Sequence, residues 1–274
     1  MEIYSAKKPA STPGLFCVTN LKPSLHDENR VNVFLNEKFE FSLDISQVID
    51  FGVKVGKNFS KEEVENLRKA SEFGKLYQRT LEWVLTRPRS IKETADHLKR
   101  KKLNRTLDNK RRLNAKRYKE EHKDENPYRN PDNLDENGHL KFRNSPWAIR
   151  TEFAPEISDE NIAAVMARLI EKGYLDDLKF AKFYVENRFV KKGISTKRLK
   201  MELSKKGIAK DIIDEVFSQS SRSEEAEIKK IIMRKRAQYD DEKLIQYLCR
   251  QGFDYSTSRE LAAQSSETDS QNLE

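Results

Sequence analysis

The sequence predicts a mainly α-helical protein, with three tandem three-helix modules preceded by a small N-terminal region that contains a β-hairpin. Two patterns lead to this fold class. Apolar residues alternate with polar ones between residues 30 and 44, and from Ser60 onward they recur at the spacing of an amphipathic helix. In addition, one helical pattern occurs three times along the chain.

Composition agrees with several small cores. Of the 274 residues, 36% are hydrophobic and 36% are charged, and the net charge is +8. An ordinary globular chain is about 45–50% apolar. No apolar run approaches the roughly 18–20 residues of a membrane span, and the N-terminus lacks the apolar stretch of a signal peptide. A cytoplasmic protein with its two cysteines, Cys17 and Cys249, reduced is therefore expected.

The N-terminal elements follow from local signals. Residues 1–29 include three prolines and a glycine, and a loose arm that can pair with a sheet edge is expected there. Residues 30–59 are expected to form the β-hairpin region, because two alternating segments flank the polar residues 36–38.

The first helical module is expected over residues 60–175. Ser60 and Glu63 form a capping box before a one-sided helix, and Pro88 ends that helix. Ser90 and Glu93 form a second capping box and open the next helix.

Two further modules align with the first. Ser90, Ser195 and Asp240 are the expected N-caps, and apolar positions recur after them. Gly207 and Gly252 stand where a helix commonly ends in a left-handed residue. The second module is expected over 176–220 and the third over 221–264, followed by a disordered tail at 265–274.

The first module differs from the others by an insertion at residues 102–156. Its first half, up to Lys123, carries a sparse apolar stripe with helical spacing that includes Leu103 and Leu107, and it is expected to extend the preceding helix. Its second half is rich in Pro, Asn and Asp and cannot continue a helix. Loops longer than about 12–15 residues tend to be functional or disordered.

Signatures of catalysis or cofactor binding are weak. The segment 52–57 has three residues between its glycines where a phosphate loop has four, so a turn is expected. Residues 133–144 resemble a calcium loop but end in Asn144 in place of the usual Glu. Asp176 and Asp177 are interpreted as capping the next helix. We expect no enzyme, no cofactor and no metal site.

Positive charge is concentrated in two windows. Residues 99–123 hold 12 basic and three acidic side chains, and residues 191–210 hold eight basic and one acidic. The rest of the chain has a net charge of −8. Such clusters are typical of polyanion binding, although a solvated helix face is the alternative. The candidate contacts with DNA are Lys99, Arg100, Lys101, Lys102, Lys110, Arg111, Arg112, Lys116, Arg117, Lys191, Lys192, Lys197, Arg198, Lys200, Lys205 and Lys206.

Several short motifs occur in a fixed order along the chain: the hairpin at 30–44, then Arg87-Pro-Arg-Ser90, Gly173-Tyr-Leu-Asp-Asp177, Arg198-Leu199, Glu202-Leu203, Lys206-Gly-Ile208 and Arg250-Gln-Gly-Phe253. Taken together and in this order, they resemble the RecX family, bacterial regulators of the RecA recombinase. The resemblance covers about two thirds of the chain, residues 30–101 and 157–262, and the insertion departs from the family pattern.

What the resemblance implies is a non-enzymatic protein that binds in the groove of the RecA–DNA filament and limits its growth, ATP hydrolysis and strand exchange. The expected partners are the RecA filament and single- or double-stranded DNA, bound through the phosphate backbone, with no membrane partner. The alternative is a helical DNA-binding protein such as a transcription regulator. A nucleic-acid-processing enzyme would need a carboxylate cluster that the sequence does not reveal.

Overall fold

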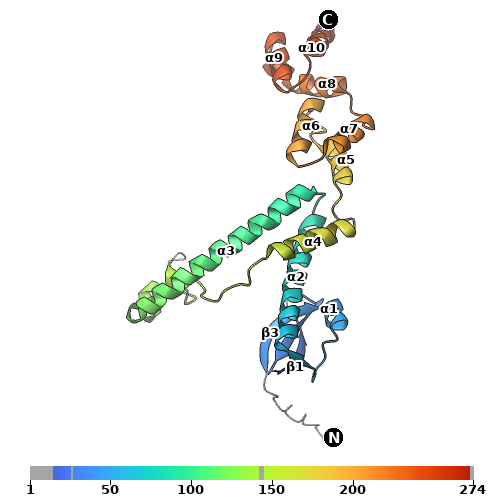
Figure 1. Ribbon diagram of the computed structural model, residues 1–274. Coiled ribbons are helices and arrows are strands. Elements are labelled where there is room, and N and C mark those ends of the chain that lie inside the picture. Colours follow the sequence, from blue (N-terminus) through green and yellow to red (C-terminus); the bar gives the residue numbers. More distant parts are fainter. Residues whose placement is uncertain (1–14, 26, 142–144, 272–274) are drawn as a thin grey trace, which may run out of the picture. The chain divides into compact units, whose positions relative to one another are not determined.

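The computed structural model describes residues 15–25, 27–141 and 145–271, with side chains up to residue 265 (Figure 1). The chain divides into two compact units. One comprises Met1–Glu82 and Leu98–Ala167, and the other comprises Trp83–His97 and Arg168–Glu274. We call them the sheet unit and the repeat unit.

A four-stranded antiparallel sheet forms the N-terminal part of the sheet unit. Its strands are β1 (Leu15–Pro23), β2 (Arg30–Leu35), β3 (Lys38–Asp44) and β4 (Asn58–Ser60), in the order β3-β2-β1-β4. The predicted hairpin is confirmed as β2–β3. Asn36 and Glu37 at its turn both have positive φ, which suits a tight two-residue hairpin link.

The N-terminal arm expected over residues 1–29 needs correction, because β1 lies within the sheet between β2 and β4. The register between β1 and β2 shifts between Val18 and Asn20, and the neighbours Cys17 and Val18 are both buried. This bulge breaks the alternation that identifies a strand in sequence. Residues 1–14 lie outside the described part of the chain.

Helix α1 (Ile45–Asp50) lies between β3 and β4, and helix α2 (Lys61–Leu85) follows β4. Val64 and Leu67 on α2 share one core with Val33 and Leu43 of the sheet. The predicted capping box at the start of α2 is confirmed: the Ser60 amide donates to Glu63 Oε2 (2.7 Å), and the Glu63 amide donates to Ser60 Oγ (3.2 Å).

The insertion forms an arm built on α3 (Ile91–Glu121), so the expected helical extension is confirmed. The described residues then include short 3-10 turns at Lys123–Glu125, Pro127–Arg129, Pro131–Asn133 and Pro146–Ala148 before α4 (Asp159–Glu171). The apolar stripe is not a core, since Leu103 and Leu107 are 58% and 47% exposed.

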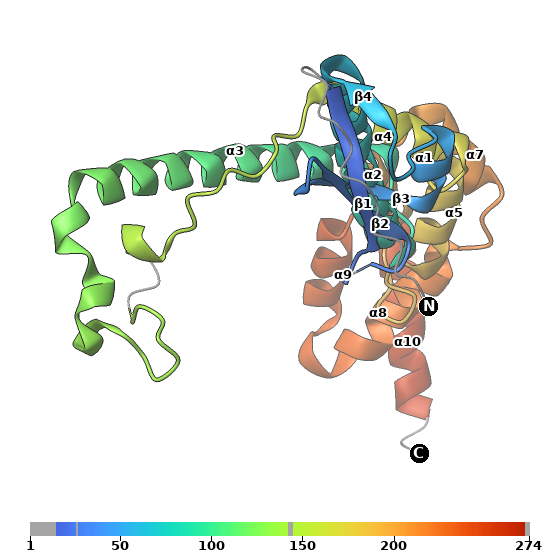
Figure 2. The ribbon, with the colours of Figure 1, turned by 90° about the horizontal axis from the view of Figure 1, so that it is seen from below.

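An extended segment, residues 149–157, returns along α3 and is held there by polar contacts (Figures 1 and 2). The Asn109 side chain makes two of them, donating to Ala154 O (2.9 Å) and accepting from the Ala154 amide (3.2 Å). Lys119 Nζ donates to Ile149 O (2.8 Å). Hydrogen bonds from side chains to the backbone therefore hold the return segment against α3.

The repeat unit contains two further three-helix modules. The second module comprises α5 (Asp177–Asn187), α6 (Thr196–Lys205) and α7 (Lys210–Ser218). The third comprises α8 (Glu224–Lys235), a 3-10 turn (Arg236–Gln238), α9 (Asp241–Arg250) and α10 (Tyr255–Gln271). Each of the two has its own apolar core. Helix α10 extends into the tail expected to be disordered at 265–274.

A joint of the same chemistry occurs twice in the repeat unit. Ser90, before α3, donates its hydroxyl to Lys206 O (2.8 Å), and Ser195, before α6, donates its hydroxyl to Gln251 O (2.6 Å). Both acceptors are C-cap residues, of α6 and of α9. Both serines also accept from the amide three residues on, as the predicted N-caps should.

The joint has two more repeated contacts. The first amide of each capped helix donates to the first residue of the next module: Ile91 N to Asp177 Oδ1 (2.9 Å), and Thr196 N to Glu224 Oε1 (3.3 Å). A glycine lies against each joint in the left-handed region, Gly207 at φ +84 and Gly252 at φ +94. The repeat found in the sequence is therefore also a repeat of the contacts between modules.

Candidate nucleic-acid interface

The basic window at residues 99–123 lies on α3, which sorts its cations onto two faces. Asn109 and Lys119 face the return segment, and Arg112 Nη1 donates to Glu152 O on the same side. Lys102 Nζ pairs with Asp159 Oδ2 at 2.6 Å. These residues hold the arm together, so their side chains are engaged within the protein.

The remaining candidate cations of this window are exposed, apart from Lys101. Lys99, Lys110 and Arg117 share one face because they are spaced by 11 and seven residues, close to whole numbers of helical turns. They form no ion pair with any residue in the described ranges. We call the exposed set, listed here, the arm cations: Lys99, Arg100, Lys110, Arg111, Lys116 and Arg117.

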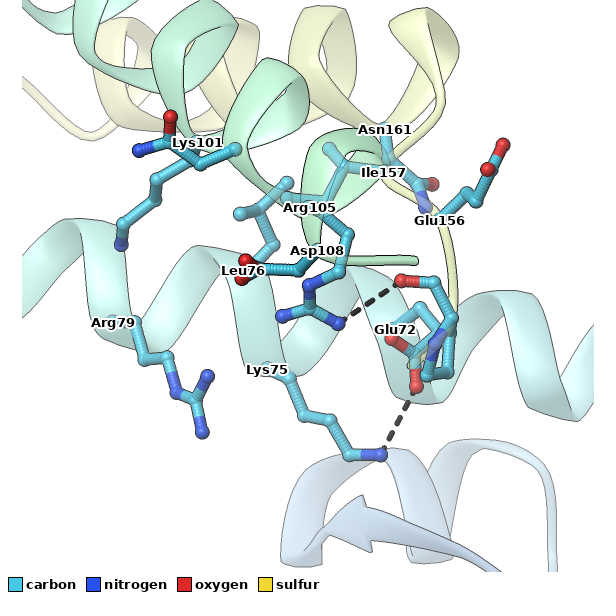
Figure 3. Close-up of a pocket in the computed structure, with 12 residues that line it drawn as sticks. Glu72, Lys75, Leu76, Arg79, Lys101, Arg105, Asp108, Glu156, Ile157 and Asn161 are labelled. Carbon is cyan, nitrogen blue, oxygen red and sulfur yellow. Dashed lines mark hydrogen bonds and ion pairs between the residues drawn. The ribbon is translucent and has the colours of Figure 1, made fainter. Parts of the chain in front are cut away.

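Lys101 instead lines a cavity of about 450 Å³ between α2, α3 and the segment before α4 (Figure 3). Burial lowers the pKa of its ammonium group, and the Arg79 guanidinium lowers this pKa further. Arg105 crosses the cavity to donate to Pro155 O (3.0 Å). Acidic side chains, among them Glu72 paired with Lys75 at 3.0 Å, line the same cavity, so its charge is mixed.

The second basic window lies around α6 in the repeat unit. Lys200 Nζ pairs with Asp214 Oδ1 at 3.0 Å, and Lys206 Nζ lies 3.9 Å from Glu93 Oε2. The other lysines in the candidate set are exposed and make no ion pair with described residues. We call these the α6 cations: Lys191, Lys192, Lys197 and Lys205.

A polar cluster fixes the framework of this second window. The Glu202 carboxylate accepts from Tyr184 OH (2.5 Å) and Arg188 Nε (2.9 Å), and Arg198 Nε lies 3.5 Å from it. Burial raises the pKa of Glu202, but the hydrogen bonds from Arg188 and Tyr184 outweigh burial, so the net shift is downward. Burial and the Glu202 contact raise the pKa of Tyr184 to about 12.

The two doubtful loop motifs have structural roles. Lys57 Nζ donates to Phe51 O (2.9 Å) and Gly52 O (3.2 Å), which closes the turn expected at 52–57. Asp135 Oδ1 accepts from the Asn137 and His139 amides at 2.9 and 2.8 Å, so the calcium-like segment also forms a turn. Among the described residues, no group of three or more His, Cys, Asp or Glu side chains is placed to hold a metal.

Sequence reasoning missed the role of Asp177 in the joint and the position of Arg234 beside the second basic window. Asp176 caps α5 as predicted, accepting from the Lys179 amide (3.0 Å), whereas Asp177 belongs to the joint with Ile91. Arg234 lies beside Arg198 and Lys192 in a cavity of the repeat unit although it is more than 35 residues away in the chain. The shared first-helix position of Asp177 and Glu224 is the signal that could have found the joint.

Among the described residues, no helix combines the length and the apolar character that a bilayer span requires. What the described surface does offer is exposed cations on two helices, α3 and α6. Each group is held by a framework of hydrogen bonds, which is an arrangement that suits a polyanionic ligand.

Comparisons with known proteins find RecX proteins that align with most of the chain. Residues 17–60 match the family described as "Regulatory protein RecX N-terminal domain", and residues 176–216 match "RecX, second three-helix domain". Regulatory protein RecX of Bacillus subtilis is 27% identical over 265 residues, covering 86% of this chain and 94% of that protein. The Bacillus licheniformis protein of the same name is 24% identical over 263 residues, covering 93% and 78%.

A solved structure shows the same fold. The crystal structure of a regulatory protein RecX matches with a TM-score of 0.55 and 17% identity, covering 88% of this chain and 96% of that one. The predicted fold class of tandem helical modules after a small β region is thereby confirmed. With the RecX N-terminal domain matched on its sheet, the RecX three-helix domain matched on its second module, and relatives aligned along most of its length, the chain is similar to the RecX family of regulatory proteins.

Proposed function

We propose that this protein binds the RecA recombinase filament on DNA and inhibits its ATP hydrolysis and strand exchange. The match of two segments of the chain to RecX family domains is the observation that carries the proposal. The modular repeat supports it, because stacked helical modules present an extended surface that suits a filament of repeating subunits.

In this proposal the arm cations and the α6 cations contact the DNA backbone of the filament. Lys99 to Arg117 spans about 27 Å of helix axis at ~1.5 Å per residue, enough to reach several phosphates. Phosphate contacts of this kind position a protein without reading sequence. They make affinity fall with salt, by about 0.7 in log–log slope for each phosphate neutralised on a single strand.

The experiment measures ATP hydrolysis by RecA on single-stranded DNA, with this protein added in increasing amounts. We expect the wild-type chain to lower the ATPase rate and to shorten the filaments seen by electron microscopy. The triple variant K110Q/R111Q/R117Q should need a higher concentration for the same inhibition, and its salt dependence should be shallower.

The matched control is K54Q/K61Q/K69Q, which removes the same charge from exposed positions of the sheet unit outside both basic windows. Unchanged ATPase rate and filament length with the wild-type chain would refute RecA regulation. Equal losses in both triple variants would refute the role of the arm cations. Tight sequence-selective binding to duplex DNA without RecA would favour a transcription regulator instead.

A further inference from the structure

A small cavity in the repeat unit has an unusual lining. It measures about 140 Å³ and lies between the turn that precedes α6, the last turn of α8 and the end of α9. Lys192, Arg198 and Arg234 contribute to its wall, and no carboxylate does. At roughly 30 Å³ per water molecule, the volume accommodates a group the size of one phosphate.

The three cations are poorly neutralised by the protein itself. Lys192 and Arg234 are exposed, and neither pairs with an acid in the described part of the chain. Arg198 donates to Gln251 Oε1 and lies 3.5 Å from Glu202 Oε1. That carboxylate is closer to Arg188, at 2.9 Å, so one negative charge serves two guanidinium groups.

The backbone beside the cavity is held in a costly conformation. Phe189 has φ +49, in the left-handed region that is unfavourable for a residue with a side chain. Its carbonyl accepts from the amides of Lys192 (2.9 Å) and Gly193 (3.0 Å). The Arg188 guanidinium lies 3.8 Å from the centroid of its ring. Strain of this kind persists where the surroundings enforce it, and here it fixes the turn that carries Lys192.

We propose that this cavity binds one phosphate group, with Lys192, Arg198 and Arg234 as its ligands. Guanidinium groups suit this role because their planar N–H donors match phosphate oxygens in pairs. A phosphate would also relieve the repulsion among three like charges around a small volume. The site recognises a phosphate and not a base, so it reads no sequence.

The phosphate has two possible sources, a nucleic-acid backbone and a free nucleotide. The inference deepens the proposed function, and it rests on that function only for the first source. A backbone phosphate bound between the second and third modules would add one contact beyond the arm cations and the α6 cations. It would place Arg234, on α8, in the DNA-binding set.

The test needs neither RecA nor DNA in its first arm. Inorganic phosphate is titrated into the ¹⁵N-labelled full chain at constant ionic strength, and the amide resonances of Gly193 and Ser195 are followed. We expect saturable shifts in the wild type and in Lys229→Gln, an exposed cation on the same helix outside the cavity. Arg234→Gln and Lys192→Gln should each weaken binding at least fivefold.

Shifts that fail to saturate, or that are equal in Arg234→Gln and the wild type, would overturn the site whatever the RecA assay shows. Conversely, saturable phosphate binding with no effect on RecA would refute the proposed function alone. The second arm measures oligothymidylate and thymidine monophosphate. A loss of oligothymidylate affinity in Arg234→Gln but not in Lys229→Gln identifies the backbone source. Saturable binding of the monophosphate with unchanged oligothymidylate affinity identifies the free nucleotide.

Discussion

Replacing Gly193 by alanine tests whether the second and third modules are packed as closely as the structure indicates. Gly193 has φ +75, and a Cβ built there would lie 2.5 Å from Glu227 O and 2.7 Å from Ile231 Cγ1. Ordinary contacts of a Cβ begin near 3.4 Å. Because Glu227 O is a backbone atom of α8, it cannot swing away as a flexible side chain could.

The expected loss of stability has two parts. A left-handed φ costs alanine about 1 kcal/mol relative to glycine. Forcing a methyl group into a filled contact costs a further ~1–3 kcal/mol. Gly173→Ala is the matched control, since Gly173 has φ +71 but no atom within 4 Å of its Cβ position. The Gly173→Ala variant should therefore lose only the first part of the free energy of unfolding, about 1 kcal/mol.

The assay is urea unfolding followed by tryptophan fluorescence in a Trp147→Phe background. This leaves Trp83, which belongs to the repeat unit, as the only tryptophan of the chain. Gly193→Ala should unfold at a clearly lower urea concentration than Gly173→Ala, by the equivalent of about 1–3 kcal/mol. If both variants unfold at the same concentration, the contact between the turn before α6 and α8 is looser than described.

Three further predictions concern the joint, the polar cluster and the arm. Ser195→Ala loses the 2.6 Å bond to Gln251 O and the cap of α6, and it should lower the free energy of unfolding by about 1–2 kcal/mol in the same assay. Because the folded-state pKa of Glu202 is lowered, its stabilisation is present above the unfolded pKa of about 4.3 and is lost as pH falls through the folded value. The wild type should therefore lose more stability than Glu202→Gln between about pH 5 and pH 3, and parallel pH profiles would contradict this. Replacing residues 102–156 by a short glycine linker should leave Trp83 fluorescence and urea unfolding intact but weaken DNA association, with the log–log salt slope reduced by about 0.7 for each lost phosphate contact; an unaltered slope would rule out the arm as a DNA contact.

Local chemistry explains which parts of the fold were predictable. The hairpin and the N-caps Ser195 and Asp240 follow from alternation and from side chains that bond amides three residues away, and both signals lie within a few residues. Strand β1 could not be predicted because its register shifts between Val18 and Asn20, so its core-contacting residues Val18 and Leu21 are three positions apart and break the period of two. The position of the return segment along α3 could not be predicted either. Asn109 holds the segment through a contact between residues 45 positions apart, and such a contact leaves no periodic pattern in the sequence.

The candidate site was predictable in composition but not in arrangement. Counting charges located both basic windows, but it treated all their cations alike. The structure shows that Lys102, Arg112 and Lys200 are committed to partners within the protein, while Lys110 and Lys192 are exposed. Which cation is engaged depends on carbonyls and carboxylates brought near by folding, and a count along the sequence cannot reveal them.

The repeated joint gives the modules a direction. At each joint a serine hydroxyl is the donor and a helix-ending carbonyl is the acceptor, so successive modules join head to tail. In the third module the equivalent residue is Asp240, whose carboxylate accepts from the Lys243 amide (2.9 Å) and pairs with Lys243 Nζ (2.8 Å). An ionised carboxylate has no proton to offer to a carbonyl. Asp240 therefore cannot make the hydroxyl-to-carbonyl bond of Ser90 and Ser195, so the chemistry of the joint changes at the third module.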